Sequence, residues 1–135
     1  MGKQRPTTGE FRDAAELRVA LRRFLRRTED VVRAHRLTPQ RYELLLLIKA
    51  SRGTATVASL SRSLHMGQTS VTQLVQRAEK LGLLRRRLSE TDRRVRYLEL
   101  TSEGESRLAA AFADLRGDRS ALTATLSDIK GFRTS

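Results

Sequence analysis

Apolar side chains recur at helical spacing along the N-terminal part of the chain. Between residues 11 and 35 the interval is mostly three or four positions, as on one face of a long helix. The apolar residues of this stripe are Leu17, Leu21, Phe24, Leu25, Val31 and Val32. Because one helix cannot bury its own stripe, it needs other helices, in the same chain or in a partner. We therefore expect a long helix over residues 11–35, preceded by a flexible tail over residues 1–10.

A second helix is predicted to start at Thr38 and to lie in the centre of the domain. Thr38 is a good N-cap, and Pro39 suits the first helical position, where no backbone N–H is needed. Residues 44–48 are apolar on nearly every side of such a helix, which is typical of a buried central element. Gly53 is well placed to end this helix.

The next stretch predicts two short helices separated by a turn at residues 65–67. Residues 54–56 are expected to form a short strand or an extended link, after which Thr56 caps the first helix. Gly67 is expected as the N-cap of the second helix, and Gly82 follows its end. Apolar residues of the second helix recur at i, i+3, i+4 and i+7, namely Val71, Leu74, Val75 and Ala78.

Residues 83–101 contain two short alternating runs around a polar turn, which indicates a β-hairpin. Leu84 and Leu88 are expected to share one face of the first strand, and Leu98 and Leu100 one face of the returning strand. A helix-turn-helix followed by a hairpin is the element order of a winged helix-turn-helix, so the predicted fold is mainly α with a small β-hairpin wing. Residues 37–101 form this winged part of a single domain that spans residues 11–135.

The C-terminal part predicts further helices. Either Thr101 or Ser102 starts the first of them, and Glu105 would complete a capping box with Ser102. Its predicted apolar stripe consists of Leu108, Ala109, Phe112 and Leu115. Residues 116–118 are expected to break or bend this helix. A last stripe follows at spacings of four and three, with Leu122, Leu126 and Ile129.

The excess of positive charge lies in the first three quarters of the chain. The formal net charge is +12, with 27 Lys and Arg against 15 Asp and Glu. The excess lies in residues 1–101, because residues 102–135 carry five of each sign. Such an excess points to a polyanion, with nucleic acid favoured over a membrane surface, whereas the alternative is a solubilising arginine-rich surface. Arg18, Arg22 and Arg26 lie four apart beside the N-terminal stripe, either as a second DNA contact or as the solvated side of the helix.

Composition also excludes several classes of protein. The chain has no cysteine, so disulfides, thiolate metal sites and thiol redox sensing are excluded. His35 and His65 have no metal-binding spacing, and His65 in the turn either meets a phosphate or faces solvent. No paired nucleophile and base and no phosphate-cradling glycine loop is visible, so we expect neither an enzyme nor a cofactor. The apolar run at residues 44–48 is too short to span a bilayer, and no signal peptide is visible, so we expect a cytoplasmic protein.

The outward face of the predicted second short helix is rich in uncharged hydrogen-bonding groups. These residues are Gln68, Thr69, Ser70, Thr72, Gln73 and Gln76. The second helix of a helix-turn-helix lies in the major groove, where Gln pairs with adenine and Ser or Thr serves several bases. We therefore interpret this face as reading DNA; the alternative is an ordinary solvated face.

The hairpin tip and its first strand carry the second candidate DNA-binding set. Asp92 and Arg94 are two residues apart and are able to form a charge-assisted pair that orders the tip. Arg93 and Arg94 would then present positive charge to a narrow minor groove, which attracts arginine. The first strand adds phosphate-binding capacity through Arg85, Arg86 and Arg87. The alternative is an ordinary exposed ion pair.

Residues 37–108 resemble the MarR family of multiple-antibiotic-resistance regulators. The matching pieces are LTPQRYELLLLI, the two short helices, KLGLLRRR, TDRRVRYLELT and the Thr101-x-x-Gly104 helix start. The resemblance implies a homodimer built from residues 11–36 and 102–131 that represses, or less often activates, transcription at a pseudo-palindromic operator. The interface residues that it suggests are Leu17, Leu21, Phe24, Leu122, Leu126 and Ile129.

Carried over by position, the resemblance makes residues 68–76 the base readers, Arg94 the minor-groove residue and Asp92 its orienting partner. Many members of the family bind small aromatic or anionic effectors between the dimer arms and the winged domain. In this chain, no set of residues identifies such an effector. Two alternatives to a regulator stay open: a winged module that binds protein or RNA, and a non-specific architectural DNA binder. Preference for B-form DNA over an RNA duplex would separate the RNA-binding alternative from the others.

Overall fold

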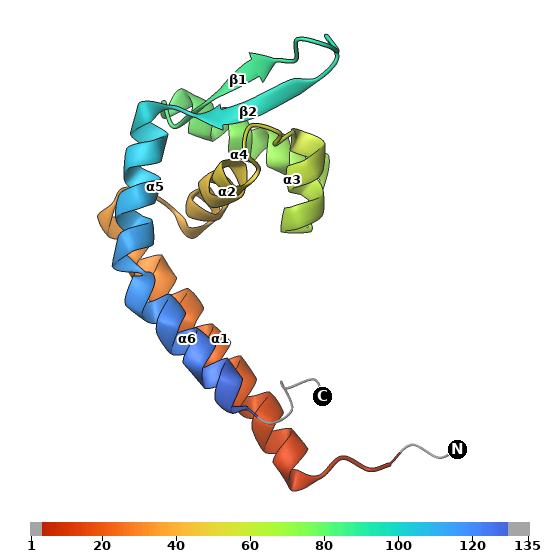
Figure 1. Cartoon of the computed structure of the whole chain (residues 1–135), viewed down its shortest axis with the longest axis vertical. Coiled ribbons are helices and arrows are strands. Elements are labelled where there is room, and N and C mark those ends of the chain that lie inside the picture. Colours follow the sequence, from red (N-terminus) through yellow and green to blue (C-terminus); the bar gives the residue numbers. More distant parts are fainter. Residues whose placement is uncertain (1–3, 130–135) are drawn as a thin grey trace. The chain divides into compact units, whose positions relative to one another are not determined.

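The structure is a computed structural model that describes residues 4–129, and the chain divides into two compact units. One unit runs from Val32 to Phe112, and the other combines the two ends of the chain, up to Val31 and from Ala113. The described residues are mainly helical and contain one antiparallel pair of strands (Figure 1), so the predicted fold class is confirmed. No helix among residues 4–129 is long and apolar enough to cross a membrane.

Helix α1 spans Thr8–Ala34 and begins three residues earlier than predicted. The backbone N–H of Glu10 donates to Thr7 Oγ1 at 3.1 Å, and the N–H of Thr7 donates to Glu10 Oε2 at 2.6 Å. These two reciprocal bonds form a capping box, which satisfies two N–H groups that have no partner inside the helix. Residues 8–10, predicted to belong to a flexible tail, are therefore helical.

The unit made from the chain ends contains most of α1 together with α6 (Arg116–Asp128), and the two helices run side by side (Figure 1). Arg27 Nε and Asp118 Oδ1 lie 3.2 Å apart and join them. Ala20, Phe24 and Leu122 line one small cavity of about 50 Å³ between the two helices. The predicted α1 stripe is only partly buried, because α6 covers one side of α1 and leaves Leu25 61% exposed.

The winged unit begins with α2 (Pro39–Ala50), which supplies Leu44, Leu45 and Ile48 to the core. Thr38 caps it as predicted, because its Oγ1 accepts the backbone N–H of Arg41 at 3.1 Å. The helix ends at Ala50, with Ser51 as its C-cap, and not at Gly53. Gly53 lies in the following loop at φ +86°, a left-handed conformation that favours glycine.

Helices α3 (Val57–Leu64) and α4 (Gln68–Lys80) form the predicted helix-turn-helix. Thr56 caps α3 in a capping box with Ser59, and Gly67 is the N-cap of α4. The turn between the helices contains His65 at φ +53°, where Ser61 donates its hydroxyl to the carbonyl of Met66.

Strands β1 (Leu84–Leu88) and β2 (Arg96–Leu100) pair in antiparallel register with Leu84 opposite Leu100. Ala55 forms a single bridge to Leu98 on the other edge of β2, which confirms the expected extended link. Leu84, Leu98 and Leu100 are buried, but Leu88 is 48% exposed. Of the two leucines expected to share a face of the first strand, only Leu84 is therefore in the core. Leu88 ends β1 beside the hairpin tip, where its cross-strand partner is the charged Arg96.

Helix α5 (Ser102–Asp114) starts at the base of the wing, and Thr101 is its cap. Thr101 Oγ1 accepts the backbone N–H of Gly104 at 3.1 Å and donates to the carbonyl of Gly82 at 2.5 Å. Of the two predicted starts, Thr101 is therefore the right one. Glu105 pairs instead with Lys49 Nζ at 2.9 Å.

The buried stripe of α5 differs from the predicted one. It consists of Gly104, Leu108, Ala111 and, just past the helix end, Leu115. Ala109 and Phe112, which were expected to be buried, are exposed. A Cβ on Gly104 would lie 2.0 Å from the carbonyl oxygen of Leu83, so α5 approaches the backbone before β1 as only glycine permits. The break between α5 and α6 falls at Leu115, directly before the predicted residues 116–118.

Candidate nucleic-acid interface

One face of helix α4 packs in the core of the winged unit, and the opposite face is exposed to solvent. Val71, Val75 and Ala78 are completely buried and fix its rotation about its axis. The polar face contains all six predicted readers; Thr72 is half-buried and the other five are exposed, namely Gln68, Thr69, Ser70, Gln73 and Gln76. No acidic residue lies in the first turn, and the N-cap Gly67 has no side chain to occupy the free N–H groups. The end of α4 that carries most of the readers therefore suits an anionic, hydrogen-bonding surface.

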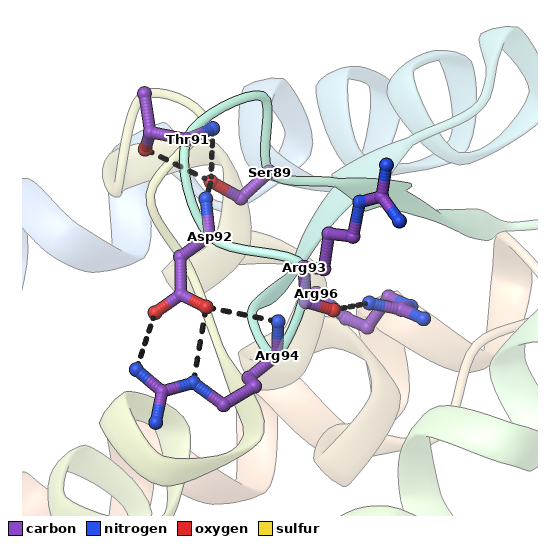
Figure 2. A network of polar contacts seen from close by, with 6 residues as sticks. All are labelled: Ser89, Thr91, Asp92, Arg93, Arg94 and Arg96. Atoms are coloured by element: carbon purple, nitrogen blue, oxygen red, sulfur yellow. Dashed lines mark hydrogen bonds and ion pairs between the residues drawn. The ribbon is translucent and has the colours of Figure 1, made fainter.

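The hairpin tip holds Asp92 against Arg94, as Figure 2 shows. Asp92 Oδ1 accepts from the Arg94 backbone N–H at 3.0 Å and from Nε at 3.1 Å, and Oδ2 accepts from Nη2 at 3.3 Å. The predicted ion pair is therefore present, with a bidentate geometry. The Arg94 guanidinium, and next its backbone N–H, hold the pKa of Asp92 below its usual value. The Arg94 side chain is nevertheless 90% exposed. Asp92 therefore orders the guanidinium while leaving it accessible to a binding partner.

Ser89 orders the tip from inside and was not singled out by the sequence. Its side chain is buried, and Oγ accepts the backbone N–H groups of Thr91 at 3.3 Å and Asp92 at 3.2 Å (Figure 2). Arg96 adds a further bond, because its Nη1 donates to the carbonyl of Arg93 at 2.6 Å. The signal for Ser89 was its place three residues before Asp92, since a serine hydroxyl commonly accepts N–H groups two or three residues onward.

Arg85 and Arg86, predicted to bind phosphate, both have acidic partners within the protein. Arg85 Nε lies 2.7 Å from Glu99 Oε1 across the strand pair, and this contact is the main reason that the pKa of Glu99 is lowered. Arg86 Nε lies 3.0 Å from Glu79 Oε1 near the end of α4. An arginine presents five N–H donors, so these pairs leave donors for phosphate, and the phosphate contact stays a prediction.

The structure shows where the other predicted residues lie but does not assign a role to them. His65 is exposed in the turn before α4, so both interpretations of it remain. All six residues suggested for a dimer interface lie in the unit of the chain ends, where Phe24 and Leu122 already meet within one chain. Among the described residues, no group of three His, Cys, Asp or Glu side chains is able to hold a metal ion.

These features define a class of protein. A helix-turn-helix with an exposed polar second helix is followed at once by a two-stranded hairpin whose arginine-bearing tip is ordered by an aspartate. This arrangement is a winged helix-turn-helix.

Comparison with known proteins finds one family whose model matches part of the chain. Residues 36–95 match the family model described as MarR family. No curated protein sequence matched. Among solved structures, AbsC, a MarR family transcriptional regulator from Streptomyces coelicolor, is 21% identical with a TM-score of 0.72, and the match covers 96% of this chain and 95% of AbsC. The chain thus matches the MarR family over residues 36–95 and has the fold of a MarR-family winged-helix structure.

Two further similar structures contain DNA. The M. tuberculosis regulator MOSR, solved with DNA, is 25% identical with a TM-score of 0.62, over 79% of this chain and 77% of MOSR. A MarR mutant from E. coli, solved with operator DNA, is 17% identical with a TM-score of 0.68, over 79% of this chain and 76% of that one. At these identities the agreement concerns the fold, and it extends beyond the residues matched by the family model.

Proposed function

We propose that this protein is a sequence-specific regulator of transcription that binds double-stranded DNA as a homodimer. The observation that carries the proposal is that one compact unit contains two different surfaces suited to DNA. They are the uncharged, hydrogen-bonding face of α4 and the Arg94 guanidinium oriented by Asp92. The DNA-bound structures of MOSR and of the E. coli MarR mutant support DNA as the partner of this fold.

The α4 face would read base edges in the major groove. Gln73 and Gln76 are exposed on the helix, and a Gln side chain donates to and accepts from adenine at once. Thr69 and Ser70 near the N-terminus of α4 would contact bases or phosphates with short hydroxyls. Side chains that pair with base edges discriminate between sequences, whereas contacts to phosphates do not, so the amides of this face favour sequence-specific binding.

The wing would bind beside this groove. Arg94 enters a minor groove as a single ordered cation, and the exposed Arg93 adds charge at the tip. Asp92 does not repel phosphate as a bare carboxylate would, because its charge is matched by Arg94 at hydrogen-bonding distance.

The homodimer rests on apolar surface in the unit of the chain ends. Helix α1 exposes Phe11, Val19, Leu21 and Leu25, although α6 lies along it. Several large apolar side chains exposed on one helix favour an interface with another molecule. A second copy would bury it in a two-fold arrangement, and two winged units would then read two half-sites related by symmetry. Repression would follow where such a dimer occupies a promoter.

An effector would act by favouring a dimer that does not fit the operator. Within the winged unit, an apolar cavity of about 340 Å³ lies between α2 and α5, lined by Leu46, Leu108 and Phe112 with Lys49 and Glu105 at its polar edge. Its size and largely apolar lining suit a small aromatic molecule.

The proposal is tested by selecting bound sequences from random duplex DNA and measuring affinity for them at two salt concentrations, together with the mass of the free protein. An inverted repeat with half-sites about one helical turn apart, bound by a protein of twice the chain mass, is the expected result. Salt-sensitive binding without a preferred sequence would instead indicate an architectural role. Absence of duplex binding at low salt would overturn the proposal and favour a protein- or RNA-binding module.

A further inference from the structure

Arg87 of the wing contacts three different residues inside the protein. Its Nη2 donates to the carbonyl of Gly53 at 3.0 Å, and its Nε lies 3.5 Å from Glu99 Oε2. Its guanidinium lies over the ring of Tyr97, with Cζ 5.0 Å from the ring centroid, within the range of a cation–π contact. The side chain thus has a carbonyl, a carboxylate and an aromatic face as partners at once.

These contacts span the width of the small sheet. Arg87 belongs to β1, and Tyr97 is its cross-strand partner on β2. The Gly53 carbonyl belongs to the loop that runs along the other edge of β2, where the N–H of Leu98 donates to the carbonyl of Ala55 at 2.8 Å. The Arg87 side chain therefore starts on one outer segment, crosses the middle strand over Tyr97, and ends on the opposite outer segment.

Arg86, next to Arg87 in β1, forms an ion pair on the other face of the sheet. Successive side chains of a strand point to opposite faces, so Arg86 lies across the sheet from Arg87. Arg86 pairs with Glu79 of α4, whereas Arg87 reaches the loop that leads into α3. The first strand of the wing is thereby joined to α4 by Arg86 and to the loop before α3 by Arg87.

We infer that Arg87 is a positioning residue that sets the wing against the helix-turn-helix, and not a phosphate ligand. The inference rests on the proposed DNA-binding function, in which α4 and the wing tip must reach neighbouring grooves in a fixed relation. If the wing moved freely relative to α4, ordering it on binding would cost free energy and weaken the affinity for DNA. Sequence position grouped Arg87 with Arg85 and Arg86 as a phosphate contact. Gly53 and Glu99 engage its Nη2 and Nε, and Tyr97 covers one face of its guanidinium, so it has fewer groups left for a phosphate than its two neighbours.

The choice of substitutions separates the two roles. Arg87→Ala removes all three contacts, and Tyr97→Leu removes the aromatic surface while keeping an apolar side chain. Arg87→Lys keeps the charge for a phosphate but loses the planar fork that stacks on Tyr97 and bonds two partners. Arg116→Ala is the control for loss of one positive charge, because Arg116 is exposed on α6, outside the winged unit.

Two readouts are made on the full-length chain. The first is hydrogen exchange of the Leu98 amide in the free protein, which reports the pairing of β2 with the Gly53–Ala55 loop. Arg87→Ala and Tyr97→Leu should each accelerate this exchange. The double variant should exchange little faster than Arg87→Ala, because the two residues act as one unit.

The second readout is affinity for the duplex recovered by selection, which Arg87→Ala should lower roughly tenfold with an unchanged salt slope. Arg87→Lys should rescue little of this loss.

Three outcomes would overturn the inference. They are a salt slope that falls by about 0.9 in Arg87→Ala, full rescue by Arg87→Lys, and a Leu98 amide whose exchange does not change. The first two would make Arg87 a phosphate ligand. If the wild-type chain binds no duplex, the proposed function fails on its own, and the exchange experiment still decides whether Arg87 ties the wing to the loop.

Discussion

Arg94 donates three hydrogen bonds to Asp92, from its backbone N–H, Nε and Nη2. Both residues lie at the hairpin tip, and the arginine side chain stays 90% exposed. An arginine on an exposed loop normally samples many rotamers, and ordering it on binding costs free energy. The aspartate removes part of that cost before DNA arrives, so it influences DNA binding without contacting DNA.

Asp92→Asn should lower discrimination between sequences. The amide keeps the size of the side chain but loses the charge-assisted bonds to Arg94, so the guanidinium is less ordered. Loss of a negative charge also favours binding to any DNA, so the quantity to measure is the ratio of affinities for the selected duplex and a random one. We expect that ratio to fall several-fold, with thermal stability changed by no more than about 0.5 kcal/mol. An unchanged ratio would mean that Asp92 does not orient Arg94 in the complex.

Gln73→Ala should relax the preferred sequence. Gln73 is exposed on the polar face of α4, and truncation removes a bidentate partner of adenine without touching the phosphates. Repeating the selection with this variant should return sites degenerate at one position of each half-site, at a cost of about 1–3 kcal/mol for the original site. The exposed Arg62 of α3 offers a comparison, since Arg62→Ala removes a charge and not a base-reading amide. Equal losses on all duplexes for Gln73→Ala would contradict a reading role.

Gly104→Ala should destabilise the winged unit. An added Cβ would lie 2.0 Å from the Leu83 carbonyl oxygen, so α5 must move away from the segment before β1. We expect a loss of about 3 kcal/mol in the free energy of unfolding, as for other overpacked backbone contacts. Gly117→Ala is the matched control, because it also places Ala early in a helix but meets nothing within 4 Å. The control should be neutral or slightly stabilising; similar losses in both variants would refute the packing argument.

The tip should keep its order across the physiological pH range. Arg94 lowers the pKa of Asp92, and Arg85 is the main cause of the lowered pKa of Glu99. A lowered carboxyl pKa stabilises the folded state at pH values above the unfolded pKa, and the contribution is lost as the pH falls through the folded pKa. Wing order should therefore be constant from pH 8 to 5 and decline only below about pH 4. Carboxyl NMR titration checks this: the Asp92 midpoint should rise in Arg94→Ala, and an equal midpoint in both chains would count against the pair.

Elements whose signals are local were predictable from the sequence. Thr38, Thr56 and Gly67 cap the helices where the sequence places them, because a cap depends on its own side chain and the next few residues. The Asp92–Arg94 pair was predictable for the same reason. The capping box of Thr7 and Glu10 has an equally local signal, but it lies before the first residue of the apolar stripe from which the helix start was predicted.

Features that depend on distant partners were not predictable in this way. Arg85, Arg86 and Arg87 are identical residues in one strand, yet Glu99, Glu79 and Gly53 give them different surroundings. Only the strand register and the approach of α4 and the loop before α3 separate them. Phe112 likewise fits a helical stripe in sequence, but the close contact of Gly104 with Leu83 rotates α5 so that Ala111 is buried instead.

The central claim is that the wing enters DNA through Arg94, and the salt dependence of Arg94→Ala tests it most directly. Affinity for the selected duplex is measured at several salt concentrations for the wild type, Arg94→Ala and the Arg116→Ala control. The account predicts weaker binding and a shallower salt slope for Arg94→Ala, by up to about 0.9, and no change for Arg116→Ala. A slope and affinity that match the wild type would contradict the claim.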